Sequence, residues 1–202
     1  MTHTPFRLGL AMALAGFMLA ACSVVGIRTG TEQSHYELVE RLGEGIEIRH
    51  YPPRLAAETT VPGSDGGPAR GEAFRRLAGF IFGDNRPGEK IAMTAPVTTD
   101  ADGSAMTMRF FMPAAYDRAS LPAPADPSVR IVELPAATLA VLRFTGSTSP
   151  ATVATRAAEL DRVLAGSPWR ATGPPFAMFY DPPWTVPFLR RNEVAVPVAT
   201  KG

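Results

Sequence analysis

Apolar and polar residues alternate with a two-residue period in residues 36–42 and 46–51, which is the pattern of half-buried β-strands. Further strands are predicted in residues 55–61, 91–99, 106–112, 129–134, 138–145, 176–180 and 193–198. Gly43 and Gly45 mark a turn or bulge between the first two strands, and Asp102-Gly103 marks a hairpin between the fourth and fifth.

Two segments follow a helical period instead. In residues 71–82, four apolar side chains fall on one helical face, namely Phe74, Leu77, Ala78 and Ile81. The second helix has clear end signals, because Ser149 suits an N-cap, Pro150 suits the first helical position and Gly166 suits the end. The intervening residues 62–70, 83–90 and 113–128 are rich in Gly, Pro or polar residues and predict loops.

The order of elements repeats between two halves, residues 36–113 and 128–198, each with strands, one helix and two further strands. Two such halves can pair their strands into one sheet with a helix on each half. The sequence therefore predicts an α+β fold, a distorted antiparallel β-barrel or sheet with two helices and pseudo-twofold duplicated halves. We expect a ligand cleft between a helix and the open face of this sheet.

Composition excludes two classes of protein. Apolar residues make up 46% of the 202 residues and charged residues 19%, which is typical of a globular chain and not of a disordered one. The formal net charge of +1 gives no dense positive field, so we expect no nucleic-acid partner.

The N-terminal residues have the features of a bacterial lipoprotein signal. Arg7 precedes an apolar run, residues 8–19, that is shorter than the roughly 20 residues of a membrane-spanning helix. The run ends in Leu-Ala-Ala-Cys, which resembles a lipobox whose cysteine receives lipid, and Cys22 is the only cysteine in the chain. The alternative is an ordinary signal peptide followed by a chance cysteine.

The lipobox interpretation divides the chain and gives it a location. Residues 1–21 would be the signal peptide, residues 22–34 the lipidated cysteine and a Gly-, Thr- and Ser-rich tether, and residues 35–202 the domain. Acyl chains on Cys22 would anchor the domain in the bacterial envelope. Ser23 follows the cysteine where an Asp tends to retain lipoproteins at the inner membrane, which favours the outer membrane, facing the periplasm.

Three segments carry a family likeness. They are the opening strands with YELV at residues 36–39 and IEIRHY at 46–51, the segment KIAMTAPV at 90–97, and the segment YDPPWTVPFLRRNEV at 180–194. Together they resemble the SOUL haem-binding proteins over about residues 35–200. This resemblance implies a distorted β-barrel with two helices, similar to the effector-binding domains of some bacterial transcription regulators. It also implies non-covalent binding of haem or a related tetrapyrrole.

The resemblance suggests where such a ligand would lie. In the family the first helix lines a hydrophobic cleft, here the face with Phe74, Leu77, Ala78 and Ile81, although the same face could simply pack on the sheet. Cations near that helix could meet the propionates or simply form a solvated polar edge, and these are Arg75, Arg76, Arg86 and Lys90. Trp184 would fold back over the core or rim the cleft, whereas the segment from Arg190 to Glu193 would fix its own loop by hydrogen bonds.

No firm axial ligand to iron is evident. His50 is a weak candidate, because a single histidine in a strand is more often a structural residue. His35 lies at the edge of the tether, and Met93 and Met178 could ligate through sulfur, but methionine more often serves adaptable packing.

Two alternatives to a binding protein stay open. One is an enzyme that removes the metal from a tetrapyrrole or opens its ring, although no zinc-ligand cluster or catalytic triad is suggested by spacing. The other is a sensor or interaction module for a different hydrophobic effector.

Overall fold

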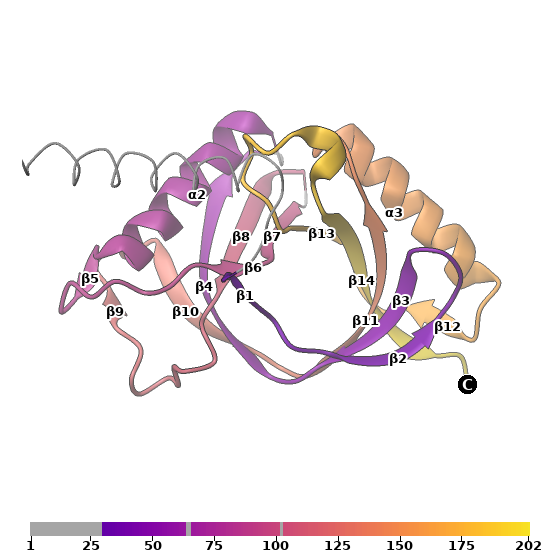
Figure 1. The fold of residues 1–202 in the computed structure, drawn as a ribbon, viewed down its shortest axis with the longest axis horizontal. Coiled ribbons are helices and arrows are strands. Elements are labelled where there is room, and N and C mark those ends of the chain that lie inside the picture. Colours follow the sequence, from indigo (N-terminus) through magenta and orange to yellow (C-terminus); the bar gives the residue numbers. More distant parts are fainter. Residues whose placement is uncertain (1–29, 64–65, 102) are drawn as a thin grey trace, which may run out of the picture.

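A large antiparallel sheet curls into a half-barrel and carries a helix on each flank (Figure 1). The computed structural model describes residues 30–63, 66–101 and 103–202. The proposed signal peptide, Cys22 and Asp102 of the predicted hairpin lie outside these residues. Among the described residues, no helix combines the length and the apolar character needed to cross a bilayer.

Nine strands form the main path of the half-barrel, in the order β10-β4-β8-β7-β13-β14-β11-β3-β2. Their bounds are β2 Glu37–Arg41, β3 Ile46–Tyr51, β4 Arg54–Pro62, β7 Val97–Ala101, β8 Ala105–Phe111, β10 Val129–Leu134, β11 Ala137–Phe144, β13 Phe176–Phe179 and β14 Asn192–Thr200. Short strands border the path: β12 Trp169–Ala171 pairs with β14, β1 Glu32–Gln33 pairs in parallel with β6 Thr94–Ala95, and β5 Asn85–Arg86 pairs with β9 Ala123–Pro124.

The duplicated halves meet where β7 pairs with β13, in a register that places Thr98 opposite Met178. On either side of this junction the strand order is mirrored, since β8, β4 and β10 on one side correspond to β14, β11 and β3 on the other. Strand β3 of the first half therefore pairs with β11 of the second half, and β10 of the second half pairs with β4 of the first. The predicted antiparallel α+β fold with two helices is confirmed.

The helices are α2 Gly67–Phe82 and α3 Pro150–Ala165, followed later by the 3₁₀ turn η1 Pro187–Leu189. The prediction for α3 is confirmed, and the Ser149 hydroxyl accepts a hydrogen bond from the Thr152 amide at 3.2 Å. The prediction that residues 62–70 are entirely loop is wrong. Helix α2 begins at Gly67 because Pro68 occupies its first turn, where the missing amide hydrogen costs nothing.

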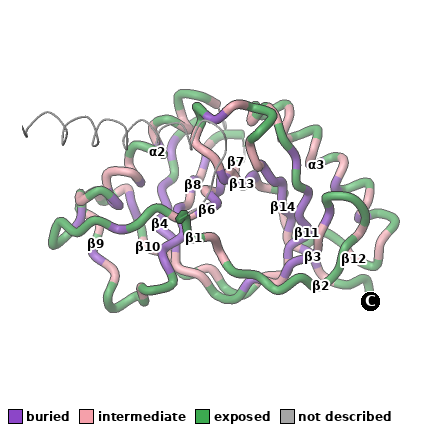
Figure 2. Tube along the Cα trace, viewed as in Figure 1, coloured by how far each residue is buried: buried purple, intermediate pink, exposed green. Residues whose placement is uncertain are grey.

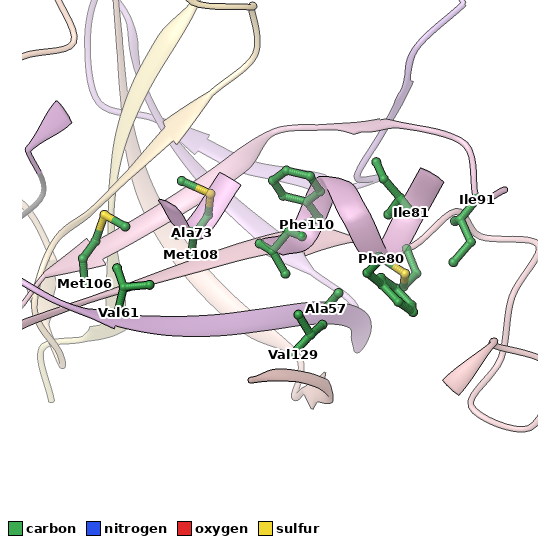
Figure 3. Close-up of a cluster of buried hydrophobic side chains, with 12 residues drawn as sticks. Ala57, Val61, Ala73, Phe80, Ile81, Ile91, Met106, Met108, Phe110 and Val129 are labelled. Atoms are coloured by element: carbon green, nitrogen blue, oxygen red, sulfur yellow. The ribbon is translucent and has the colours of Figure 1, made fainter. Parts of the chain in front are cut away.

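Each helix covers one half of the sheet over its own apolar cluster, and buried residues concentrate along the strands between them (Figure 2). Under α2, the cluster joins Leu77, Phe80 and Ile81 to Met106, Met108 and Phe110 of β8 (Figure 3). Under α3, Leu160 and Leu164 pack on Val194 and Val196 of β14. A third cluster lies on the opposite face of the sheet and includes Tyr51, Met178 and Tyr180.

Candidate functional site

Helix α2 directs only part of its apolar face toward solvent. Leu77 and Ile81 have at most 1% of their surface exposed and belong to the core, so for these two the simple packing alternative holds. Phe74 is 37% exposed and its ring meets that of Phe110 edge-on at 5.4 Å between centroids. Ala78 is half-buried. Of this face, Phe74 offers a ligand the most surface.

The two arginines on α2 lie in a polar recess. Arg75 and Arg76 both pair with Glu72, the latter at 2.8 Å, and they share the recess with Asp84 and Asp126. Hydrogen bonds from both arginines lower the pKa of Glu72, which keeps the pairs charged. These cations are therefore engaged by carboxylates, and the recess has no apolar wall for a macrocycle.

The other predicted contacts lie apart from one another. Arg86 is exposed in β5, and Lys90 and Met93 are exposed in the loop before β6. Trp184 is 63% exposed on the loop that precedes η1. Whether any of these residues contacts a ligand stays a prediction.

The candidate iron ligands are also separated. His50 lies on the sheet face that α3 covers, together with Ile46 and Ile48, and its Nδ1 is 3.2 Å from the Thr138 hydroxyl. Met178 is buried in the third apolar cluster. Within the described part of the chain, no three His, Cys, Asp or Glu side chains are grouped to hold a metal ion.

A cleft of about 410 Å³ opens elsewhere, between the N-terminal segment around β1, the corner before β4 and the loop after β8. Its volume lies in the range of small-molecule sites, roughly 300–1,000 Å³. Apolar side chains form much of its wall, namely Pro52, Pro53, Leu55, Phe111, Met112 and Pro113. Such a wall suits a flat apolar guest.

Arg54 is the cation in the interior of this cleft, whereas Arg118 lies at the rim. Its guanidinium carbon lies 4.3 Å from the ring centroid of Tyr51 and 4.5 Å from that of Phe111, so two aromatic faces hold it in place. The Nε atom is buried without a hydrogen-bond partner, and burial lowers the pKa of the guanidinium. Cation–π contacts contribute roughly 0.5–2 kcal/mol each, which offsets part of the cost of burying this charge.

The remaining polar residues of the cleft lie at its rim. His35 and Arg118 are exposed there, as are three carboxylates, Glu32, Asp117 and Glu133. Glu32 accepts a hydrogen bond from the Ala114 amide at 2.7 Å. Hydrogen bonds from Ser120 lower the pKa of Asp117, so this carboxylate is satisfied within its own loop. Solvent screens these rim charges, whereas Arg54 sits deeper against the two rings.

A buried network of charged hydrogen bonds lies next to the cleft and centres on Glu193. Glu193 of β14 has no exposed surface. Its carboxylate accepts hydrogen bonds from Arg49 at 2.9 Å, from Arg191 at 2.8 Å and from the Tyr180 hydroxyl at 2.7 Å. Burial raises the pKa of Glu193, but the two arginines and the tyrosine outweigh burial and leave this pKa lowered. The carboxylate is therefore held ionised.

Two contacts connect this network with the cleft. Arg49 donates to the Tyr51 hydroxyl at 3.3 Å, and the ring of Tyr51 is one of the two that hold Arg54. Arg191 donates to Gln33 Oε1 at 3.1 Å, which fastens β1 to the end of the β13–β14 loop. The cleft is thus built on a rigid frame of charged hydrogen bonds.

The family-like segment at residues 180–194 serves this frame. Arg190 donates to the carbonyls of Thr185 and Pro183 at 2.7 and 2.5 Å, and the Arg191 amide donates to Asp181 at 2.6 Å. The prediction that this segment fixes its own loop is confirmed.

Sequence reasoning missed Arg54 and its aromatic partners. The only local signal is Pro52-Pro53 just before β4, which marks a corner but not a binding group. Phe111 reaches Arg54 through the β4–β8 pairing, in which Ala56 lies opposite Phe111, and strand order cannot be read from one sequence.

The comparison with known families decides what kind of protein this is. The model described as "SOUL heme-binding protein" matches residues 31–197, which include both halves, the cleft and the ionic network. The chain belongs to the SOUL family. Among SOUL relatives, heme-binding protein 1 of Sus scrofa is 31% identical over 130 residues, which span 61% of this chain and 68% of that protein. Heme-binding protein 1 of Mus musculus is 33% identical over 131 residues, with the same two shares.

Solved structures share the SOUL fold at low sequence identity. The EcmrR C-terminal domain has a TM-score of 0.53 at 15% identity and covers 82% of this chain and 99% of its own. An uncharacterized conserved protein from Listeria innocua has a TM-score of 0.57 at 13% identity, covering 76% of this chain and 92% of its own. At these identities the likeness concerns the fold alone.

Proposed function

We propose that this protein binds haem or a related tetrapyrrole, non-covalently, in the cleft bounded by β1, the start of β4 and the end of β8. The observation that carries the proposal is the coincidence, in a SOUL chain, of a cleft of about 410 Å³, an apolar wall and the buried, unpaired Nε of Arg54. Haem needs an apolar slot for its ring and cations for its propionates. Heme-binding names of the relatives support the same ligand class.

His35 is the histidine that this cleft offers to iron. It lines the cleft next to β1, whereas His50 lies on the face under α3. If the bound tetrapyrrole carried iron, the imidazole of His35 would supply a nitrogen to hold the metal. The residues of the cleft thus fit a metal tetrapyrrole without requiring a separate metal-binding cluster.

Titration with hemin tests both the function and the position of the ligand. For residues 23–202, the form without the lipid anchor, we expect a saturable Soret shift at about one hemin per chain. His35→Ala should change the Soret position, while Phe74→Ala on α2, the matched control, should leave the spectrum and affinity unchanged. Uptake no different from that of a nonspecific carrier such as albumin would contradict the function. If Phe74→Ala changed the Soret spectrum or the hemin affinity and His35→Ala did not, the ligand site would be assigned to α2 instead of this cleft.

The proposal includes a location and a role. The lipobox-like residues 19–22 support lipid attachment at Cys22 and an anchored position in the bacterial envelope, at the outer membrane facing the periplasm. The protein would hold its ligand and not transform it. A time course of hemin spectra with a reductant, with and without protein, distinguishes this role from ring opening or loss of the metal.

A further inference from the structure

Arg54 differs from the other inward-facing arginines of the sheet in having no carboxylate partner. Arg49 and Arg191 share Glu193, and Arg109 pairs with Glu58 at 2.7 Å. For Arg54, no hydrogen bond or ion pair to another described residue is found, and its neighbours are the rings of Tyr51 and Phe111. A partly buried cation that the described residues leave without a counter-charge is suited to an anion from outside.

The surroundings of Arg54 restrict the chemistry of that anion. The guanidinium presents planar pairs of N–H donors that match the two oxygens of a carboxylate, and the two rings fix the plane of the donors. The neighbouring wall is formed by Pro52, Pro53 and Met112, which offer no further charge. The guest must therefore place one anionic group at Arg54 and an apolar body along this wall.

We infer that Arg54 selects the ligand by its carboxylate, so that the cleft takes a flat apolar acid and discriminates against the corresponding neutral ester. This inference rests on the proposed function and specifies the ligand class of the same cleft. Arg54 is a specificity-determining residue here, and the contact needs no metal in the ligand. A metal-free porphyrin therefore isolates the effect of Arg54 from any bond between His35 and iron.

The test compares protoporphyrin IX with its dimethyl ester, which has the same ring and no carboxylates, by fluorescence titration of residues 23–202. We expect wild type to bind the diacid roughly 10- to 100-fold more tightly than the ester, as one charge-assisted hydrogen-bonded contact provides. Arg54→Gln should remove most of that preference and leave ester affinity within about twofold. Arg54→Lys should keep part of the preference, because it retains the charge but loses the planar fork.

Arg130→Gln is the matched control, since Arg130 is an arginine of the neighbouring strand β10 that pairs with Glu58 outside the cleft. It should preserve the wild-type preference. Equal wild-type affinity for diacid and ester overturns the inference but leaves tetrapyrrole binding intact. Failure of wild type to bind either porphyrin or hemin overturns both. The comparison of the two porphyrins on wild type holds even if Arg54→Gln does not fold.

Discussion

At the scale of single residues, Glu193 determines how the inner face of the sheet is held. It is a fully buried carboxylate that accepts hydrogen bonds from two arginines and a tyrosine. Removing one partner from a buried ionic group leaves the others desolvated and unpaired. Glu193 is therefore the residue on which Arg49 and Arg191 both depend.

Glu193→Gln should destabilise the protein by about 3–5 kcal/mol, because Arg49 and Arg191 would keep their burial and lose their counter-charge. Urea denaturation measures this change. Glu159→Gln, which breaks the exposed Arg156–Glu159 pair on α3, serves as control and should cost at most about 0.5 kcal/mol. Similar costs for the two variants would contradict the bracing role of the network.

The same carboxylate predicts how stability varies with pH. The pKa of Glu193 is lowered in the folded state, so its contribution is complete above the unfolded value of about 4.3 and is lost as pH falls through the lower folded value. Wild type should thus lose stability steeply below about pH 4. Melting temperatures across pH should show a flatter acid limb for Glu193→Gln, and an unchanged limb would argue against this assignment.

At the scale of elements, the two helices show what local sequence can and cannot establish. Ser149 and Pro150 define the start of α3 correctly because capping is a local interaction. The start of α2 at Gly67 was missed because its N-cap, Gly66, has no side chain that could form a capping hydrogen bond and so mark the helix start in the sequence. Strand positions follow from alternation, but the contact of Arg54 with Phe111 and the place of His35 depend on strand pairings that alternation does not encode.

Ser149→Ala should destabilise the protein by about 1 kcal/mol, since the Thr152 amide would lose its acceptor at the N-terminus of α3. Thermal unfolding followed by circular dichroism measures this change. The control is Thr155→Ala, which removes an exposed hydroxyl from the same helix and should change stability by less than about 0.5 kcal/mol. A larger effect of the control would assign the loss to α3 as a whole and not to its cap.

At the scale of the whole molecule, the exchange of strands between the halves joins them into one continuous sheet. Strands β3 and β10 each complete the sheet of the opposite half, so neither half has a full sheet alone. The duplication was predictable from the order of elements, whereas this exchange was not, because sequence order does not specify partners.

Cys22→Ser tests the proposed anchoring of the whole molecule. Without a thiol to receive lipid, the protein should no longer incorporate a radiolabelled fatty acid such as palmitate. Ser23→Ala is the control and should be labelled like wild type. Labelling of Cys22→Ser equal to that of wild type would contradict the lipoprotein interpretation.

One wall of the cleft is formed by the residues around β1. Strand β1 pairs with β6, and its Gln33 accepts a hydrogen bond from Arg191. Strand β1 lies within residues 22–34, the segment proposed as the tether to the membrane. A recombinant form trimmed to residue 36 would keep both helices and the curled sheet, yet it would lose His35 and that wall together. Such a shortened protein should still unfold cooperatively as a folded domain. Its ligand binding would nevertheless not represent that of the longer chain, because the cleft would be incomplete.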